Sequence, residues 1–258
     1  MILHRFTKHV TEQNWFPAFI ELILIILGVF IGLQANSWNE ERIAKVTTQS
    51  YYERLIEDLQ TEETMRVHRI AYNASTLKHG ESVIDALNQS IDNLGAQFLI
   101  DLYQASQIWP YTPQRTTYDE IISGNIADTI PDIKLRNKLA NYYLNLEAQK
   151  VIQGERTSYR NNLRRYMQHE IQKFIRENCG DITEYTVNNI EIGHLPEECE
   201  LKVDPIIISN AVSKLSSYKN LELDLTRHLA DVEQKIVSLK YYIPATRELI
   251  KYLEELQH

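Results

Sequence analysis

The N-terminal part of the chain holds one long apolar run, Phe16–Leu33, in which Glu21 is the only charged residue. At about 1.5 Å per residue, a helix that continues to Trp38 reaches about 34 Å, enough to cross the hydrocarbon core of a bilayer. Trp15, Phe16 and Trp38 flank the run, where membrane helices carry interfacial aromatic residues. The pattern therefore predicts a transmembrane helix.

Two alternatives to a transmembrane helix are considered. Arg5 and Lys8 precede the run and Leu33-Gln34-Ala35 is a tolerable cleavage context, as in a cleaved signal peptide. The run is longer than the usual apolar region of about 7–15 residues and is interrupted by Glu21, which favours a retained anchor. A buried helix of a soluble protein is the second alternative, but no other segment is apolar enough to surround it.

The pattern beyond the span predicts long helices. After Trp38, apolar residues recur at steps of three and four, which predicts a helix to about Asn88 with a break near Gly80. We interpret five acidic residues as its solvated side: Glu53, Glu57, Asp58, Glu62 and Glu63. Further helices are predicted over 97–109, 117–123, from Asp132 past Gly154 to about Asn178, and from Asp204-Pro205 onward. The last region includes a long amphipathic helix over 221–242, which Pro244 kinks or restarts.

The fold class expected from these elements is mainly α. An N-terminal transmembrane helix continues into an antiparallel bundle of long helices, with a small disulfide-bounded β-hairpin insert. The hairpin is predicted from alternating residues at 185–187 and 190–192 around Asn188-Asn189. The expected organisation is a cytoplasmic tail (1–15), the span (16–38), the first part of the bundle (39–178), the hairpin insert (179–203) and the C-terminal helices (204–258).

Composition agrees with a helical body. The chain has only 8 glycines in 258 residues, and neither Gly nor Pro occurs between Leu33 and His79 or between Pro205 and Pro244. The formal net charge of −8 provides no basic footprint, so nucleic acid is not expected as a partner.

Only two cysteines are present, Cys179 and Cys199. They bracket a compact segment, and such a pair suits a disulfide in an oxidising compartment, where it would contribute roughly 3 kcal/mol. Two merely buried thiols are the alternative. A zinc site is not expected, because His194 alone lies between them and no second ligand pair appears. Basic residues on the two sides of the span do not decide its orientation, so the cysteines carry the prediction of a cytoplasmic N-terminus and a periplasmic body.

Two segments resemble a bacterial family of single-pass membrane proteins of unknown function. The first is the stretch from Ile20-Glu21-Leu22 through Gly28 and Gly32 to Gln34-Ala35-Asn36-Ser37-Trp38-Asn39-Glu40. The second is Thr117-Tyr118-Asp119-Glu120-Ile121-Ile122-Ser123-Gly124-Asn125, followed by Leu135-Arg136 and Tyr142-Tyr143. The resemblance covers about 70 residues. It implies a membrane-anchored helical protein and supplies no activity. The expected location of the chain is the bacterial inner membrane.

The span carries a stripe that is suited to helix association. At 100° per residue, Glu21, Gly28, Gly32 and Asn39 fall within about 20° of one line, and Ala35 lies near it. Small residues let membrane helices approach closely, and an intramembrane carboxylate prefers protein or water to lipid. We expect this stripe to pack against another copy of the chain or against another membrane protein. The alternatives are a chance Gly-x-x-x-Gly pair and a Glu21 that reaches the membrane surface.

The search for catalytic chemistry is negative. The eight histidines are scattered without the i, i+4 spacing of helix-borne metal ligands, and no phosphate-binding glycine loop or nucleophile motif occurs. Arg156, Arg160 and Arg164 form a basic stripe that we interpret as a solvated face. We expect a non-enzymatic structural or interaction subunit, without cofactor or metal, in contact with membrane lipid. A ligand-sensing or ion-conducting accessory subunit that uses Glu21 is the alternative.

Overall fold

The computed structural model describes residues 15–89, 94–124, 126, 130–187 and 189–257. In chain order its elements are α2 (Trp15–Leu87), α3 (Ala96–Ala105), α4 (Thr116–Ser123), α5 (Ile133–Gly154), α6 (Ser158–Tyr166), α7 (His169–Asn178), β1 (Ile182–Tyr185), β2 (Glu191–His194), α8 (Pro205–Ser216) and α9 (Leu221–Glu255). The predicted fold class is confirmed, because a long apolar N-terminal helix continues into a helical body that carries a disulfide-bounded hairpin.

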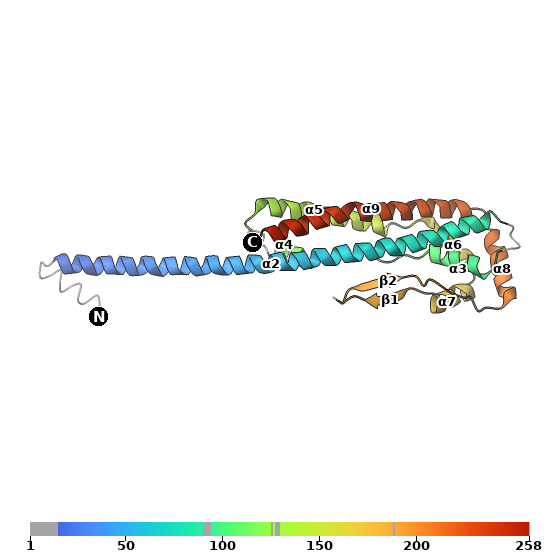
Figure 1. The fold of residues 1–258 in the computed structure, drawn as a ribbon, viewed down its shortest axis with the longest axis horizontal. Coiled ribbons are helices and arrows are strands. Elements are labelled where there is room, and N and C mark those ends of the chain that lie inside the picture. The colour runs from blue at the N-terminus through green and yellow to red at the C-terminus, as the bar shows by residue number, and fades with distance from the viewer. Residues whose placement is uncertain (1–14, 90–93, 125, 127–129, 188, 258) are drawn as a thin grey trace.

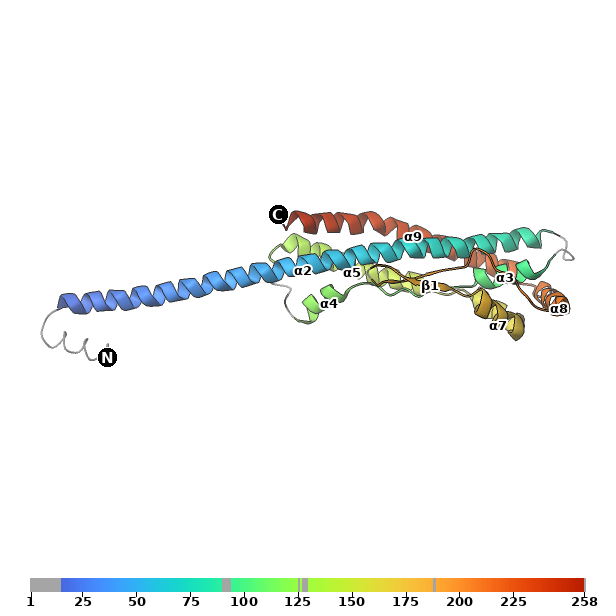
Figure 2. The same ribbon diagram turned by 60° about the horizontal axis from the view of Figure 1, so that its bottom comes forward.

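Helix α2 is 73 residues long, or about 110 Å. Its N-terminal half extends away from the rest of the protein, and its second half forms one side of the bundle (Figure 1, Figure 2). The predicted break near Gly80 is wrong, since α2 continues to Leu87. Gly80 is buried against the side chain of Leu229 on α9, where a Cβ would overlap the leucine. The glycine therefore serves close helix packing.

Helix α9 runs antiparallel to α2 and returns towards the point where α2 enters the bundle (Figure 1). Arg247 of α9 binds Glu63 of α2 at 2.6 Å. Helix α5 lies against α9, where Tyr142 Oη and Thr246 Oγ1 are 3.1 Å apart. The helix does not restart at Pro244, because α9 continues through this residue as one helix.

The single long helix expected from Asp132 to about Asn178 is three helices, α5, α6 and α7. The chain adopts extended backbone at Glu155 (ψ 138°) and again at Met167 (ψ 130°), which ends α5 and α6. Beyond these breaks the apolar residues of α6 and α7 pack into a second core, and α6 remains in contact with α9 through the stacked rings of Tyr159 and His228.

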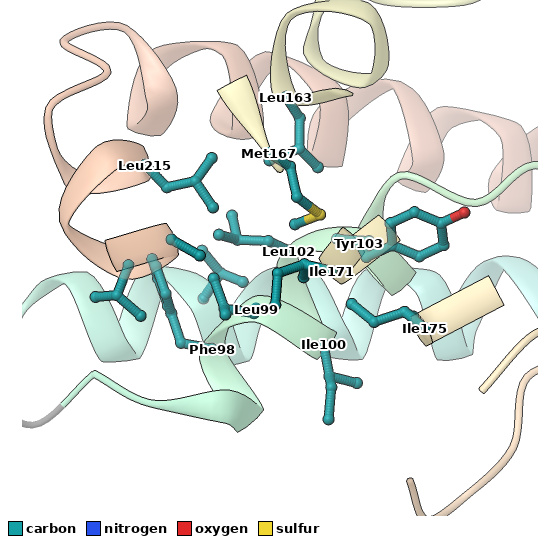
Figure 3. Packing of buried hydrophobic residues seen from close by; sticks show 14 of the residues in the cluster. Phe98, Leu99, Ile100, Leu102, Tyr103, Leu163, Met167, Ile171, Ile175 and Leu215 are labelled. Carbon is teal, nitrogen blue, oxygen red and sulfur yellow. The ribbon is translucent and has the colours of Figure 1, made fainter. Parts of the chain in front are cut away.

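Two apolar cores stabilise the body. The core nearer the N-terminal extension joins α2, α4, α5 and the end of α9 through residues such as Leu55, Leu135 and Leu253. The far core joins the end of α2 with α3, α6, α7, α8 and the start of α9, and Figure 3 shows Leu99, Leu102 and other residues of this core packed together. The stretch of α2 between the two cores buries polar side chains, which are described below.

The hairpin pairs β1 with β2 antiparallel, with Ile182 opposite His194 and Tyr185 opposite Glu191. The prediction of a hairpin is confirmed, but the first strand lies earlier than the predicted 185–187. Asn189 has a φ of 58°, the left-handed conformation that Asn tolerates better than most residues. Asn188, the other predicted turn residue, lies outside the described residues.

Candidate functional site

The apolar part of α2 is exposed along its whole length. Phe16 and the large apolar side chains from Phe19 to Leu33 are all solvent-exposed, and no described part of the chain covers them. One helix of the described residues, α2, is long and apolar enough to cross a membrane. An uncovered apolar surface of this size is unusual in a soluble protein and marks a contact with membrane or with another protein.

The predicted interfacial aromatics lie at the two ends of this segment. Trp38 is 78% exposed and Phe16 is 72% exposed, so both rings are free to contact a bilayer. Trp15 is the first residue of α2, and the structure does not describe its side chain. About 33 Å of helix rise separates residues 16 and 38.

The stripe of Glu21, Gly28, Gly32, Ala35 and Asn39 lies on one face of this helix, as the spacing predicts. A Cβ added to either glycine would meet nothing within 4 Å, so the face is open. Glu21 is half-buried, and its Oε2 is shielded without a hydrogen-bond partner among the described residues. The structure leaves the stripe free for a contact that this chain alone does not make.

The stripe faces away from the bundle. Leu55 and Leu59, which are buried in the near core, follow Asn39 by sixteen and twenty residues, so they lie about 160° and 200° around the helix from it. Glu57 follows Asn39 by eighteen residues, lies on the same face and is exposed. A second helix on the glycine face would therefore meet neither α5 nor α9.

A belt of buried charged residues on α2, here called the charge belt, separates the two cores. Glu62 is 0% exposed and Arg66 is 1% exposed. Glu62 Oε1 accepts hydrogen bonds from Arg66 Nε at 2.9 Å and from the Tyr111 hydroxyl at 2.7 Å. Its Oε2 accepts one from the backbone N–H of Gln114 at 2.9 Å. Three donors therefore bind a carboxylate that water does not reach, and the charge of Arg66 neutralises it.

Two more residues of α2 bind the same loop, which connects α3 to α4. Arg69 donates from Nη1 to the Trp109 carbonyl and from Nη2 to the Pro110 carbonyl, both at 2.6 Å. Asp58 accepts from Gln114 Nε2 at 3.0 Å and from the Thr117 backbone N–H at 2.8 Å. The charge belt therefore consists of Asp58, Glu62, Arg66 and Arg69, and it fixes the proline-rich loop on α2.

The belt shifts the ionisation of its own members and neighbours. Burial lowers the pKa of Arg69 to about 10. Burial raises the pKa of Tyr142, whose ring lies 5.9 Å from the Arg66 guanidinium, to about 12. Burial and the charge of Glu62 raise the pKa of Tyr111. These tyrosines remain protonated near neutral pH and act as hydrogen-bonding groups, with no proton to transfer at that pH.

Sequence reasoning missed this belt. Asp58 and Glu62 were assigned to the solvated side of α2, and both are buried. The pattern of spacing held a signal, because Asp58, Glu62, Arg66 and Arg69 recur at steps of three and four from the apolar Leu55 and Leu59. The same correction applies to the arginine stripe of α6. Arg160 and Arg164 turn inward and bind the chain around Ser106 and Gln107, and Arg156 alone of the three is exposed.

The predicted disulfide is present. Cys179 and Cys199 are bonded, with 5.6 Å between their Cα atoms, in the range of ordinary disulfides. Cys179 follows α7, and Cys199 lies in the segment after β2, so the bond closes the hairpin insert. The bond also adjoins the far core, which contains Cys179.

No group of three or more His, Cys, Asp or Glu side chains within the described residues is placed to hold a metal ion. The chain matches no protein-family model, no curated protein and no solved structure.

Proposed function

We propose that this chain is a single-pass membrane protein of the bacterial inner membrane. In this proposal residues 16–38 of α2 cross the bilayer, the N-terminus lies in the cytoplasm, and the helical body lies in the periplasm. Copies associate through the glycine face of α2, and the protein acts as a structural or interaction subunit of a membrane assembly. The observation that carries the proposal is the uncovered apolar segment at the N-terminal end of α2, with an open glycine face opposite the bundle.

Membrane insertion is supported by the distribution of exposure along α2. The large apolar side chains between Phe16 and Leu33 are exposed, whereas buried residues occur regularly after Tyr52. Burial of such a surface in lipid removes it from water at about 25 cal/mol per Å², which disfavours a freely soluble protein. The resemblance of the segment from Ile20 to Glu40 to single-pass membrane proteins supports the same placement.

The periplasmic placement of the body is supported by the disulfide. Disulfides persist in the periplasm and are rare in the bacterial cytosol, where thiols are kept reduced. The bond joins Cys179 and Cys199, which are 20 residues apart in the sequence and belong to the body. In this proposal the body and the N-terminal Arg5 and Lys8 lie on opposite sides of the membrane.

Self-association is supported by the direction of the stripe. Two parallel copies that meet at Gly28 and Gly32 place their bundles on opposite outer sides, so close helix contact meets no steric obstacle. This arrangement has two-fold symmetry, in which the same patch of each copy forms the interface.

The association is tested on the full-length chain in a mild detergent. The variant Gly28→Leu/Gly32→Leu adds two bulky side chains to the proposed interface, and we expect the particle mass from light scattering to fall from two copies to one. The control Ile23→Ala/Phe30→Ala changes the opposite face of the span and is expected to leave the mass unchanged. An unchanged mass in the glycine variant, or a wild-type protein that is already a single copy, contradicts the proposed interface.

The placement is tested by thiol accessibility in intact cells. A unique cysteine introduced at Glu222, which is exposed on α9, is expected to react with a membrane-impermeant maleimide added outside spheroplasts. A unique cysteine at Lys8 should react only after the membrane is permeabilised. The reverse pattern, or recovery of the full-length chain in the soluble fraction, contradicts the proposed topology.

Glu21 supports a second candidate function, ion conduction by an accessory subunit. Its carboxylate oxygen Oε2 is shielded and unpartnered among the described residues, in an apolar segment where carboxylates mark ion pathways. The test is proton flux into liposomes that contain the purified protein. Flux that is present in the wild type and lost in Glu21→Gln supports conduction, and equal flux in both proteins removes it.

A further inference from the structure

A cavity of about 520 Å³ opens at the end of the body that is far from the apolar extension. One wall is formed by His79 of α2, and a second by Gln97 and Gln104 of α3. The third wall is the segment 196–200, which follows β2. The volume lies within the range of ordinary small-molecule sites.

The third wall is acidic. Glu197 and Glu198 are exposed at the cavity and form no ion pair or hydrogen bond with the described part of the chain. Glu200 also lines the cavity, and it pairs with Lys202 at 3.5 Å. Among the described residues that line this cavity there is no Lys or Arg. The site therefore offers at least two uncompensated negative charges.

A buried polar group in the second wall is independent of these glutamates. Gln104 is only 1% exposed, and its Nε2 donates to the Cys179 carbonyl at 2.5 Å. This bond identifies the amide nitrogen, because a carbonyl oxygen accepts only from a donor. The amide oxygen Oε1 is shielded and receives no hydrogen bond from the described residues. Buried acceptors in folded proteins almost always have a donor, so a donor is missing here.

The first wall adds another acceptor. His79 Nδ1 lies 2.7 Å from Asp101 Oδ1, and Gln97 Nε2 donates to the same carboxylate oxygen at 2.9 Å. The carboxylate orients the ring with the Nδ1 proton towards Asp101. In the neutral ring Nε2 is then an acceptor, and no described residue donates to it.

We propose that this cavity binds a small organic ammonium ion that carries several N–H donors, such as a polyamine. Glu197 and Glu198 neutralise its charge, and Gln104 Oε1 and His79 Nε2 accept hydrogen bonds from its nitrogen atoms. An ammonium ion fits better than a metal ion, because no three His, Cys, Asp or Glu side chains of the described residues converge as a metal site would require. It fits better than an anion because the uncompensated charges at the site, those of Glu197 and Glu198, are negative.

The disulfide is part of the same site. Cys199 lies between Glu198 and Glu200 in the acidic wall, and its partner Cys179 offers the carbonyl that orients Gln104. One covalent bond therefore holds the acidic wall next to the amide. Binding consequently requires the oxidised protein.

Calorimetric titration of the full-length protein in mild detergent with spermidine, at constant ionic strength, tests the proposal. We expect saturable binding at one site per chain. Tetramethylammonium chloride supplies positive charge without N–H donors, and calcium chloride supplies a hard metal ion. Both are expected to bind at least about tenfold more weakly, because the hydrogen bonds to the acceptors are missing or unsuited.

The variant Glu197→Gln/Glu198→Gln removes the two free charges at exposed positions, and we expect spermidine affinity to fall by about tenfold or more. The control Glu222→Gln/Glu233→Gln removes the same charge from exposed positions of α9 and should bind as the wild type does. Cys179→Ser/Cys199→Ser, if its thermal unfolding shows a folded body, should also lose binding. The absence of saturable binding in the wild type, or an equal loss in the glutamate variant and its control, overturns the proposal.

Discussion

Asp58 of α2 accepts a hydrogen bond at 2.8 Å from the backbone N–H of Thr117, so that one helix caps the first turn of another. The N-cap residue of α4, Arg115, makes no side-chain cap of its own. The first N–H groups of a helix need partners, and a carboxylate near them also interacts favourably with the helix dipole. Helix α4 is thus positioned by α2, the helix that carries the apolar N-terminal segment.

Replacement of Asp58 tests this capping contact. Asp58→Ala removes the acceptor of two hydrogen bonds, and we expect the free energy of unfolding to fall by about 1–2 kcal/mol. Urea unfolding of the detergent-solubilised protein measures the change. Glu57→Ala, at the exposed neighbouring position, is the control and should stay within about 0.5 kcal/mol of the wild type.

The ion pair of Glu62 and Arg66 is expected to be costly to break from one side only. Arg66→Met leaves a fully buried carboxylate without its cation, and we expect a loss of about 3–5 kcal/mol in the free energy of unfolding. The double variant Glu62→Gln/Arg66→Met has no charge at either of these two positions and keeps an amide oxygen for Tyr111 or Gln114. It should be more stable than Arg66→Met. A double variant that is less stable than the single one contradicts this account of the charge belt.

The buried His228 is expected to make the free energy of unfolding depend on pH. Its Nε2 donates to the Ala105 carbonyl at 2.8 Å, and its Nδ1 lies 2.8 Å from Thr157 Oγ1, a hydroxyl that can donate to the neutral ring. Burial lowers its pKa, with Lys235 and Arg160 acting in the same direction and the Ala105 carbonyl and Asp231 opposing them. The unfolded chain, with an ordinary pKa near 6.5, therefore binds the proton more readily than the folded one.

Because the pKa of His228 is lowered in the folded protein, acid destabilises the fold. The stability that His228 contributes is complete above about pH 6.5 and is lost as the pH falls below that value towards the lowered pKa. Between pH 6.5 and 5.5 we expect the wild type to lose up to about 1 kcal/mol more than His228→Gln, whose amide does not titrate. Denaturant unfolding at both pH values measures the difference. Parallel losses in the two proteins would show that other groups set the acid sensitivity.

Gly193 and Gly154 differ in the space around them, so alanine substitutions at these two positions can be compared. Gly193 of β2 lies against the ring of Trp109, where a Cβ would overlap the ring carbons, whereas a Cβ at Gly154 meets nothing within 4 Å. We expect Gly193→Ala to lower the free energy of unfolding by about 1–3 kcal/mol through displacement of Trp109. Gly154→Ala should be neutral or stabilising by a few tenths of a kcal/mol. Thermal unfolding of the two variants measures the contrast, and equal midpoints would contradict the contact.

The sequence alone determined the features that depend on local pattern. The apolar run from Phe16 to Leu33, the helical body and the pairing of the two cysteines could be predicted because composition and spacing specify them directly. Helix starts were also readable. Asp132 and Asp204 both accept hydrogen bonds from the first turn of the helix that follows, as their positions before α5 and α8 indicate.

Tertiary structure decided what charged residues do. Asp58 and Glu62 look like solvated positions because a periodic pattern of apolar residues says nothing about polar residues that bind a distant loop. Their partners, Gln114 and Tyr111, lie about 50 residues further along the chain and reach them only through the fold. The breaks after Gly154 and at Met167 arise in the same way, since burial in the far core outweighs the local preference for a continuous helix. The sequence thus identifies the helices and strands. Contacts between segments distant in the sequence decide which of their polar residues are buried and what they bind.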